Sequence, residues 1–141
     1  MPTSPVVQEF FERYERSRNT FDPALVDSLY PDAFMFAGPA GARVADKAVV
    51  LAGLPKGHAW LKTLGHTRTK LTALHETSLD GIYAMVRAKF VWRFEKTPAP
   101  IDVDVETTFI VHLTDGAPKI VFQHESEDFR QALRARGVLE S

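Results

Sequence analysis

At 141 residues the chain has the length of one ordinary domain, and we expect residues 1–141 to form a single folded unit. Its 17 basic and 18 acidic side chains leave a net charge of −1, which argues against nucleic acid as a partner because phosphate binding needs a basic surface. The absence of cysteine excludes disulfides and thiolate chemistry. We find no signal peptide and no run of about 18 apolar residues, so we expect a cytoplasmic protein without a membrane partner.

The first third of the sequence has helical patterns. A helix is expected to begin at Ser4, followed by Pro5, and apolar residues then recur at helical spacing as far as Tyr14. The pair Asp22-Pro23 predicts a second, short helix, which Pro31 ends.

Two short strands and a third helix should follow. Residues 33–37 and 43–44 are typical of strands on either side of a turn rich in glycine and proline. Asp46 is expected to cap a helix that Pro55 breaks, with one further helical turn before Gly65.

The second half of the chain changes to the alternation of strands. Asp80-Gly81 and Asp115-Gly116 each predict a two-residue hairpin loop, because both residue types tolerate positive φ. Residues 96–99 form a looser connection that contains proline. A last helix is expected to be capped by Ser126 and to end at Gly137.

This order predicts an α+β fold in which helices cover a curved, mixed but mainly antiparallel sheet. In the middle hairpin, a register that places Arg93 opposite Asp102 and Lys89 opposite Glu106 brings opposite charges together on one face. That outer face is mostly polar, but apolar residues interrupt it, so it is suited to forming a homodimer.

The covered face should contain a pocket. Tight turns at both ends would align Ala73, Ala88, Thr107 and His124 in one row between bulkier rows, and small side chains there would leave space. A threonine and a histidine at the end of that space could supply polar contacts, as in ligand sites generally. We therefore expect a small apolar molecule to bind there.

The chain resembles the nuclear transport factor 2-like superfamily, which has a cone-shaped, cystatin-like fold and includes SnoaL-like polyketide cyclases and ketosteroid isomerases. The resemblance covers nearly the whole chain. It rests on the order of four local features, which are residues 21–23, residues 29–34, the turn at 38–41 and the final strand at 120–126. This superfamily hosts many unrelated functions, so the resemblance implies a fold and not a reaction.

Comparison with the ketosteroid isomerases removes one specific reaction. Their carboxylate base would stand before Pro39, where this chain has Gly38. Their catalytic tyrosine on the first helix aligns with Tyr14, which is either a hydrogen-bond donor in the pocket or an ordinary helix residue.

His124 and Tyr14 are the candidate catalytic residues. The ordinary pKa of histidine allows His124 to act as acid or base near neutral pH, but a structural histidine bonded to Thr107 is an equally open interpretation. No spacing of histidines and carboxylates indicates a metal site, and we expect no cofactor. The candidate ligand-binding residues share an expected inward position or an aromatic ring: Phe34, Phe36, Trp60, Ala73, Ala88, Phe90, Trp92, Thr107, Phe109 and Phe122.

Two hypotheses follow from the sequence. In the first, the chain binds a small molecule in an apolar interior pocket and, if it is an enzyme, acts as a cofactor-free cyclase, isomerase or dehydratase. In the second, it is a non-catalytic dimeric module that interacts through the outer face of its sheet. The sequence leaves open whether the protein is an enzyme.

Overall fold

A computed structural model describes residues 3–113 and 117–140 of the chain. The elements in chain order are α1 (Pro5–Thr20), α2 (Pro23–Asp27), β1 (Ala33–Gly38), β2 (Gly41–Asp46), α3 (Lys47–Thr63), β3 (His66–Leu79), β4 (Tyr83–Phe94), β5 (Ile101–His112), β6 (Lys119–Glu125) and α4 (Phe129–Ala135). The strands form one sheet in the order β2-β1-β6-β5-β4-β3. Only the β1–β6 pair is parallel among these strands, so the predicted α+β fold with a mixed, mainly antiparallel sheet is confirmed.

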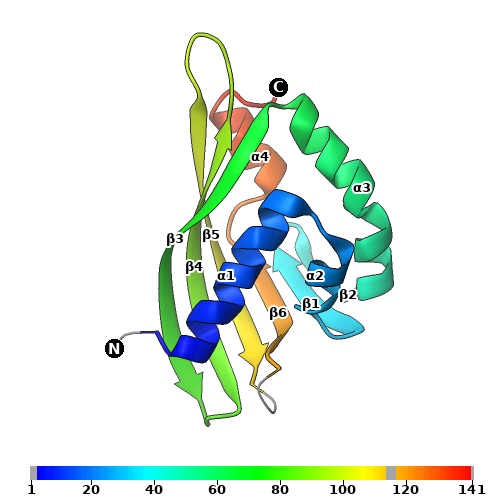
Figure 1. Ribbon diagram of the computed structural model, residues 1–141, viewed down its shortest axis with the longest axis vertical. Coiled ribbons are helices and arrows are strands. Elements are labelled where there is room, and N and C mark those ends of the chain that lie inside the picture. Colours follow the sequence, from blue (N-terminus) through cyan, green and yellow to red (C-terminus); the bar gives the residue numbers. More distant parts are fainter. Residues whose placement is uncertain (1–2, 114–116, 141) are drawn as a thin grey trace.

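The sheet curves around helix α1, which lies across its concave face (Figure 1). Helix α3 lies beside α2 and the β1–β2 hairpin, and α4 lies at the upper end against β5. One apolar core forms between α1, α2 and the sheet, and a second forms where α4 and the end of α3 meet β4 and β5. The helices therefore enclose one face of the sheet and leave the other exposed.

Helix α1 buries one stripe of its surface. Pro5 stands in its first turn, where the missing N–H costs no helical hydrogen bond. Phe10, Phe11 and Tyr14 are 1%, 0% and 5% exposed and face the sheet. Complete burial of a side chain of this size contributes roughly 1.5–3 kcal/mol. The same face of α1 continues to Arg18, one turn beyond Tyr14.

Two predicted helix boundaries are wrong. Helix α3 continues through Pro55, because the proline removes only one backbone donor, and the buried Leu54 and Leu61 hold the helix against the core on either side. Helix α4 is capped by Asp128, whose carboxylate accepts a hydrogen bond from the backbone of Gln131, instead of Ser126.

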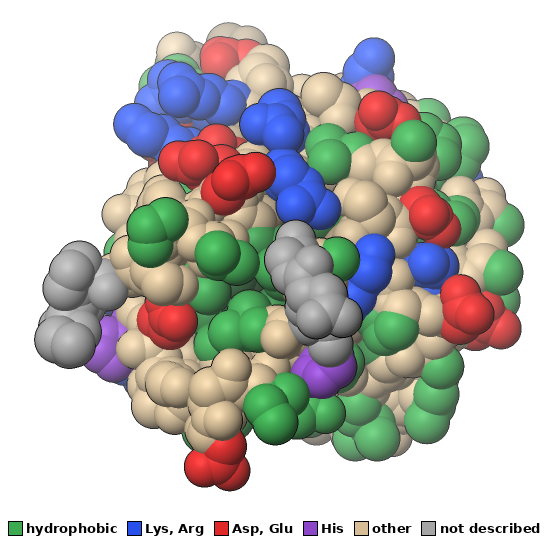
Figure 2. All heavy atoms as spheres, turned by 60° about the horizontal axis from the view of Figure 1, so that its bottom comes forward, with side chains coloured by type: hydrophobic (Ala, Val, Ile, Leu, Met, Phe, Trp, Pro, Cys, Tyr) green, Lys and Arg blue, Asp and Glu red, His purple; other side chains and the backbone are tan. Residues whose placement is uncertain are grey.

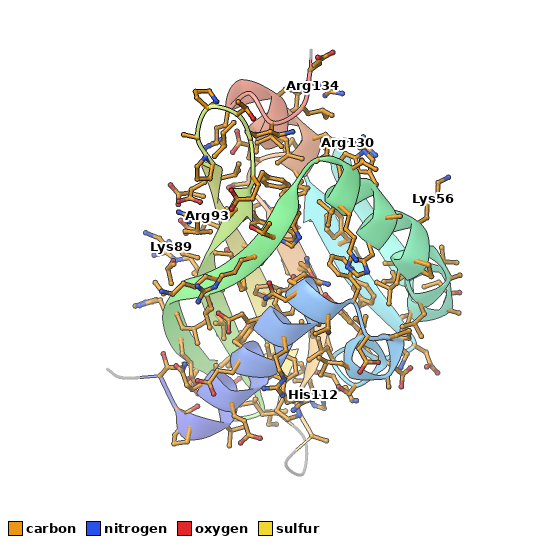
Figure 3. The ribbon with its side chains drawn as sticks, turned by 45° about the horizontal axis from the view of Figure 1, so that its top comes forward. Lys56, Lys89, Arg93, His112, Arg130 and Arg134 are labelled. Carbon is orange, nitrogen blue, oxygen red and sulfur yellow. The ribbon has the colours of Figure 1, made fainter. Side chains whose placement is uncertain are left out.

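The predicted register of the middle hairpin is confirmed. Arg93 pairs with Asp102 and Lys89 pairs with Glu106 across β4 and β5. The guanidinium of Arg93 donates two hydrogen bonds to the Asp102 carboxylate, at 2.9 and 3.1 Å. Lys89 and Arg93 project from the outer face of the sheet in Figure 3.

The other two predicted registers are each wrong by one residue over part of their length, at residues 73–79 in β3 and at residues 107–110 in β5. They are correct at residues 68–71 of β3 and 111–112 of β5. The loop between β3 and β4 has three residues, so Ala88 faces Leu74, and Ala73 faces Lys89. An irregularity at Ile110 in the β5–β6 pair places Thr107 opposite Glu125. The predicted turn at Asp115-Gly116 lies outside the described residues.

The lower end of the molecule exposes hydrophobic side chains among basic and acidic ones, as Figure 2 shows. Ile82 is 53% exposed there, because the three-residue loop places it in the turn between β3 and β4.

Candidate functional site

A cavity of about 220 Å³ lies between α1 and the concave face of the sheet, near the start of α4. We call it the Arg18 cavity. It is lined by Tyr14, Arg18, Phe21, Phe90, Trp92, Val105, Thr107, Gln123, Glu125 and Phe129. These residues come from α1, three central strands and α4, so the cavity exists only when the helices and the sheet are assembled together.

Aromatic rings form the apolar walls of the cavity. The Trp92 and Phe129 rings are 4.8 Å apart, and the Tyr14 and Phe90 rings are 5.4 Å apart. Phe21 ends α1 in the left-handed conformation, with φ of 53°, which is unusual for a bulky residue. Strain of this kind occurs where other contacts hold a residue in place, and Phe21 directs its ring to the cavity.

A chain of hydrogen bonds forms the polar wall. The Arg18 guanidinium donates to the Tyr30 hydroxyl at 3.0 Å, and this hydroxyl donates to Oε1 of Gln123 at 2.8 Å. The Gln123 amide in turn donates to a carboxylate oxygen of Glu125 at 3.5 Å. These hydrogen bonds thus connect the Arg18 cation on α1 to the Glu125 carboxylate on β6, along one side of the cavity.

Arg18 is a half-buried charge that faces the cavity. Its guanidinium lies 4.2 Å from the centre of the Tyr14 ring, in the geometry of a cation–π contact. Burial alone would lower the pKa of Arg18, but its interactions with Tyr14, Tyr30 and Glu125 outweigh burial and raise it. Burial raises the pKa of the Tyr30 hydroxyl as well, and Arg18 opposes that shift. Arg18 therefore stays positively charged at neutral pH, and Tyr30 stays neutral.

Glu125 lies between the cavity and a second hollow. That hollow, of about 400 Å³, is lined by Phe36, the β1–β2 turn and strand at residues 38–43, Glu125 and Asp128. Burial raises the pKa of Glu125, with a further increase from Asp128, whereas Arg18, Gln123 and His124 act to lower it. The carboxyl group is thus easier to protonate than an ordinary glutamate.

His66 packs against Trp92, one of the aromatic wall residues of the cavity. It begins β3 and lies 5.1 Å from the ring of Trp92, while its Nε2 forms a 2.8 Å hydrogen bond with the Thr69 hydroxyl. Burial lowers the pKa of His66, and the nearby His58 lowers it further, against an opposing backbone hydrogen bond. His58 itself stacks on Phe21 at 4.5 Å, so each histidine packs against one wall residue.

The structure brings four of the predicted site residues to the cavity, namely Tyr14, Phe90, Trp92 and Thr107. Ala88 is completely buried and pairs with Thr107 beside it. The rings of Phe34 and Phe109 are buried in the core, where they pack against Tyr30 and Tyr14, respectively.

Three predicted positions are wrong. His124 pairs with Thr108 and lies on the outer face, because its neighbours Gln123 and Glu125 face the cavity. Phe122 and Ala73 lie on the same outer face, for the same reason of register.

Two further candidates, Phe36 and Trp60, lie outside the Arg18 cavity. Phe36 lines the hollow beside the β1–β2 hairpin, beneath the guanidinium of Arg43. Trp60 on α3 is covered by Arg130, whose guanidinium is 4.3 Å from the ring; Figure 3 shows Arg130 extending from α4.

Sequence reasoning missed the polar wall. Arg18 follows Tyr14 by four residues and therefore shares its helix face, which is the signal that could have identified it. Tyr30, Gln123 and Glu125 had no such signal, since the inward position expected for His124 implies that its two neighbours in the strand face outward.

Two further properties concern the part of the chain that the structure describes. Within residues 3–113 and 117–140, no three histidine or carboxylate side chains come together in a group that could hold a metal ion. None of the described helices combines the length and apolar character needed to cross a membrane.

Comparison by sequence finds no matching protein-family model and no matching curated protein. Comparison by structure finds an NTF2-like protein from Cytophaga hutchinsonii (14% identity, 91% of this chain, 100% of that chain, TM-score 0.67). A Nostoc punctiforme protein with a cystatin-like fold is also similar (14%, 92% and 96%, TM-score 0.67). So is the CaMKII hub of S. rosetta (18%, 91% and 100%, TM-score 0.68).

These similarities define the architecture as a helix-covered, cystatin-like sheet. The chain has the nuclear transport factor 2-like fold, as its sequence resemblance implied. At these identities the likeness concerns the fold alone, so the function has to be argued from the site.

Proposed function

We propose that this protein binds a small, largely apolar molecule with one polar end in the Arg18 cavity. The observation that supports this proposal is the division of the cavity into an aromatic wall and a polar wall. Small-molecule sites are generally concave and apolar with a few fixed polar groups. Here the fixed groups are Arg18 and Gln123, which hydrogen bonds to Tyr30 hold in place.

The proposal is a binding function and not a reaction. A proton-transfer step was expected to use His124 together with Tyr14. Tyr14 lines the cavity but His124 lies on the opposite face of the sheet, so the two residues cannot act together on one ligand. A catalytic group must be within hydrogen-bond reach of the proton it transfers.

Filling the cavity tests this proposal. Val105→Phe adds a ring to the cavity wall, and Val91→Phe adds the same ring on the outer face of the neighbouring strand. Toluene, phenol and benzyl alcohol serve as neutral probes, followed by backbone amide chemical shifts. We expect shifts at Thr107 and Gln123 in the wild type and Val91→Phe, and none in Val105→Phe. Absence of shifts with every probe, including benzoate, in the wild type would contradict the proposal.

A second candidate function is homodimerisation through the outer face of the sheet. Five apolar residues form a continuous row across five strands of that face: Val44, Met35, Phe122, Ile110 and Met85. Val44 is 69% exposed and Met35 is 38% exposed. Contiguous apolar surface of this kind is typical of interaction sites.

Sedimentation velocity tests the dimer. Phe122→Asp places a charge at the centre of the row, whereas Val49→Asp places the same charge on α3, at a residue that is also 69% exposed. We expect a wild-type dimer that only Phe122→Asp dissociates. A monomeric wild type at all concentrations would exclude this function.

A further inference from the structure

We infer that the ligand of the Arg18 cavity is a small carboxylate whose anionic group binds the guanidinium of Arg18. This inference rests on the proposed binding function and adds the chemical class of the ligand. It depends on the charge, the partners and the surroundings of Arg18, taken in turn below.

The neighbours of Arg18 leave its charge without a paired anion. Its hydrogen-bond acceptor is the neutral hydroxyl of Tyr30, and its stacking partner is the neutral ring of Tyr14. Among the described residues, no carboxylate lies within the 4.0 Å of an ion pair with Arg18. Removing a charge even partly from water is costly unless the charge is paired, so an anion in the cavity would offset a cost that the half-buried Arg18 already carries.

The guanidinium is also held in a fixed position. The Tyr30 hydroxyl donates its proton to Gln123, and its lone pair therefore faces Arg18. A guanidinium has five N–H donors in a rigid plane, and the bond to Tyr30 uses one of them. The planar arrangement suits a carboxylate, which can accept two parallel hydrogen bonds. Because Arg18 is already ordered, binding would cost little further entropy.

The size and walls of the cavity restrict the rest of the ligand. Its volume of about 220 Å³ is below the about 300–1,000 Å³ that is usual for drug-sized ligands. Phe21, Trp92 and Phe129 surround that volume with aromatic rings. A short-chain or single-ring carboxylate fits these limits, whereas a second charged group would have no partner at the aromatic end.

Glu125 opposes the anion and so sets the selectivity of the site. Its carboxyl group shares the cavity with Arg18, but it also borders the hollow at residues 38–43. A bound carboxylate would therefore favour Glu125 in its neutral form or turned toward that hollow. Removing this charge by Glu125→Gln should strengthen the binding of an anion more than that of a neutral analogue.

Benzoate and its neutral analogue benzamide test the inference by isothermal titration calorimetry. Charge-assisted hydrogen bonds are worth about 1.5–3 kcal/mol, so we expect benzoate to bind about 10- to 100-fold more tightly than benzamide. Arg18→Met should abolish this preference, and Arg18→Lys should retain part of it. Arg16→Met, an exposed arginine on the same helix, should behave as the wild type. Circular dichroism establishes that each variant is folded.

The outcomes separate this inference from the proposed function. A preference for benzoate that is lost in Arg18→Met and enhanced in Glu125→Gln supports both. Equal binding of benzoate and benzamide, or a preference that Arg18→Met retains, overturns the carboxylate inference and leaves the binding function intact. Failure of both probes and of the neutral panel to bind overturns the proposed function itself. If Arg18→Met does not fold, the Arg18→Lys and Glu125→Gln results decide.

Discussion

The guanidinium of Arg18 stacks on the ring of Tyr14 at 4.2 Å and donates a hydrogen bond to the hydroxyl of Tyr30. The first of these contacts joins neighbouring turns of α1, and the second joins α1 to the segment between α2 and β1. A cation is thus fixed inside an aromatic cavity by neutral partners. The predictions below concern this arrangement and the residues that support it.

Tyr30→Phe should lower stability without changing the fold. The substitution removes the hydroxyl that accepts a hydrogen bond from Arg18 and donates one to Oε1 of Gln123. The side chain of Gln123 is only 6% exposed. A buried polar group that loses its partner costs about 1–3 kcal/mol, and urea unfolding should show a loss of that size. Tyr83→Phe removes a hydroxyl from a side chain that is 39% exposed and should cost almost nothing. Equal losses in the two variants would show that the Tyr30 bonds do not matter.

Glu125 should make the protein less stable as pH rises. The pKa of Glu125 is raised by burial and by Asp128, despite the opposing effects of Arg18, Gln123 and His124. The folded state then binds a proton that the unfolded state, with a pKa of about 4.3, has released. Stability from this group is complete below that value and is lost as pH rises through the folded pKa. Glu125→Gln should therefore gain stability relative to the wild type between pH 4 and neutrality.

Urea unfolding at a series of pH values measures this difference. Glu9→Gln is the control, because it removes the same carboxylate from an exposed residue of α1. A stability difference between wild type and Glu125→Gln that stays constant with pH would mean that the carboxyl group is not perturbed.

His66 should have the opposite effect at mildly acid pH. Its pKa is lowered by burial and by His58, so the folded state keeps it neutral where the unfolded state, with a pKa of about 6.5, takes up a proton. Stability is complete above that value and is lost as pH falls toward the lowered folded pKa. His66→Gln should flatten this loss, whereas His75→Gln, an exposed outer-face residue, should not. Identical pH profiles for wild type and His66→Gln would contradict the prediction.

Gly65→Ala should destabilise the turn between α3 and β3. Gly65 has φ of +92°, and an added Cβ would lie 2.5 Å from the carbonyl oxygen of Glu95. Strain of this kind costs on the order of 1–3 kcal/mol. Gly57→Ala in α3 meets nothing within 4 Å and should instead stabilise by roughly 0.5–1 kcal/mol. Thermal unfolding should move in opposite directions for the two variants, and a shift in the same direction would show that the backbone at Gly65 has relaxed.

The sequence predicted the order of helices and strands better than it predicted which face of β3 and β6 each side chain occupies. Opposite charges at Arg93 and Asp102 fixed the middle register correctly, because one pairing satisfied several contacts at once. The flanking registers depended on loop length and on an irregularity at Ile110, which have no clear mark in the residues. A shift of one residue moves every side chain of a strand to the other face, so His124 and Glu125 exchanged places.

The candidate site was therefore predicted in part. The aromatic residues Phe90 and Trp92 and the helix residue Tyr14 were expected at the pocket and are found there. Arg18 was missed because an arginine near a helix end is ordinarily exposed and suited to the helix dipole. Its half-buried position beside the cavity is held by Tyr30, which lies 12 residues away and approaches only in the folded chain.

A crystal structure of the protein soaked with 4-bromobenzoate tests the central claim most directly, because the anomalous signal of bromine locates the ring independently of the protein model. The account predicts bromine among Phe21, Trp92 and Phe129, with the carboxylate within hydrogen-bond distance of the Arg18 guanidinium. Bromine bound only at the surface, or a carboxylate directed away from Arg18, would contradict it.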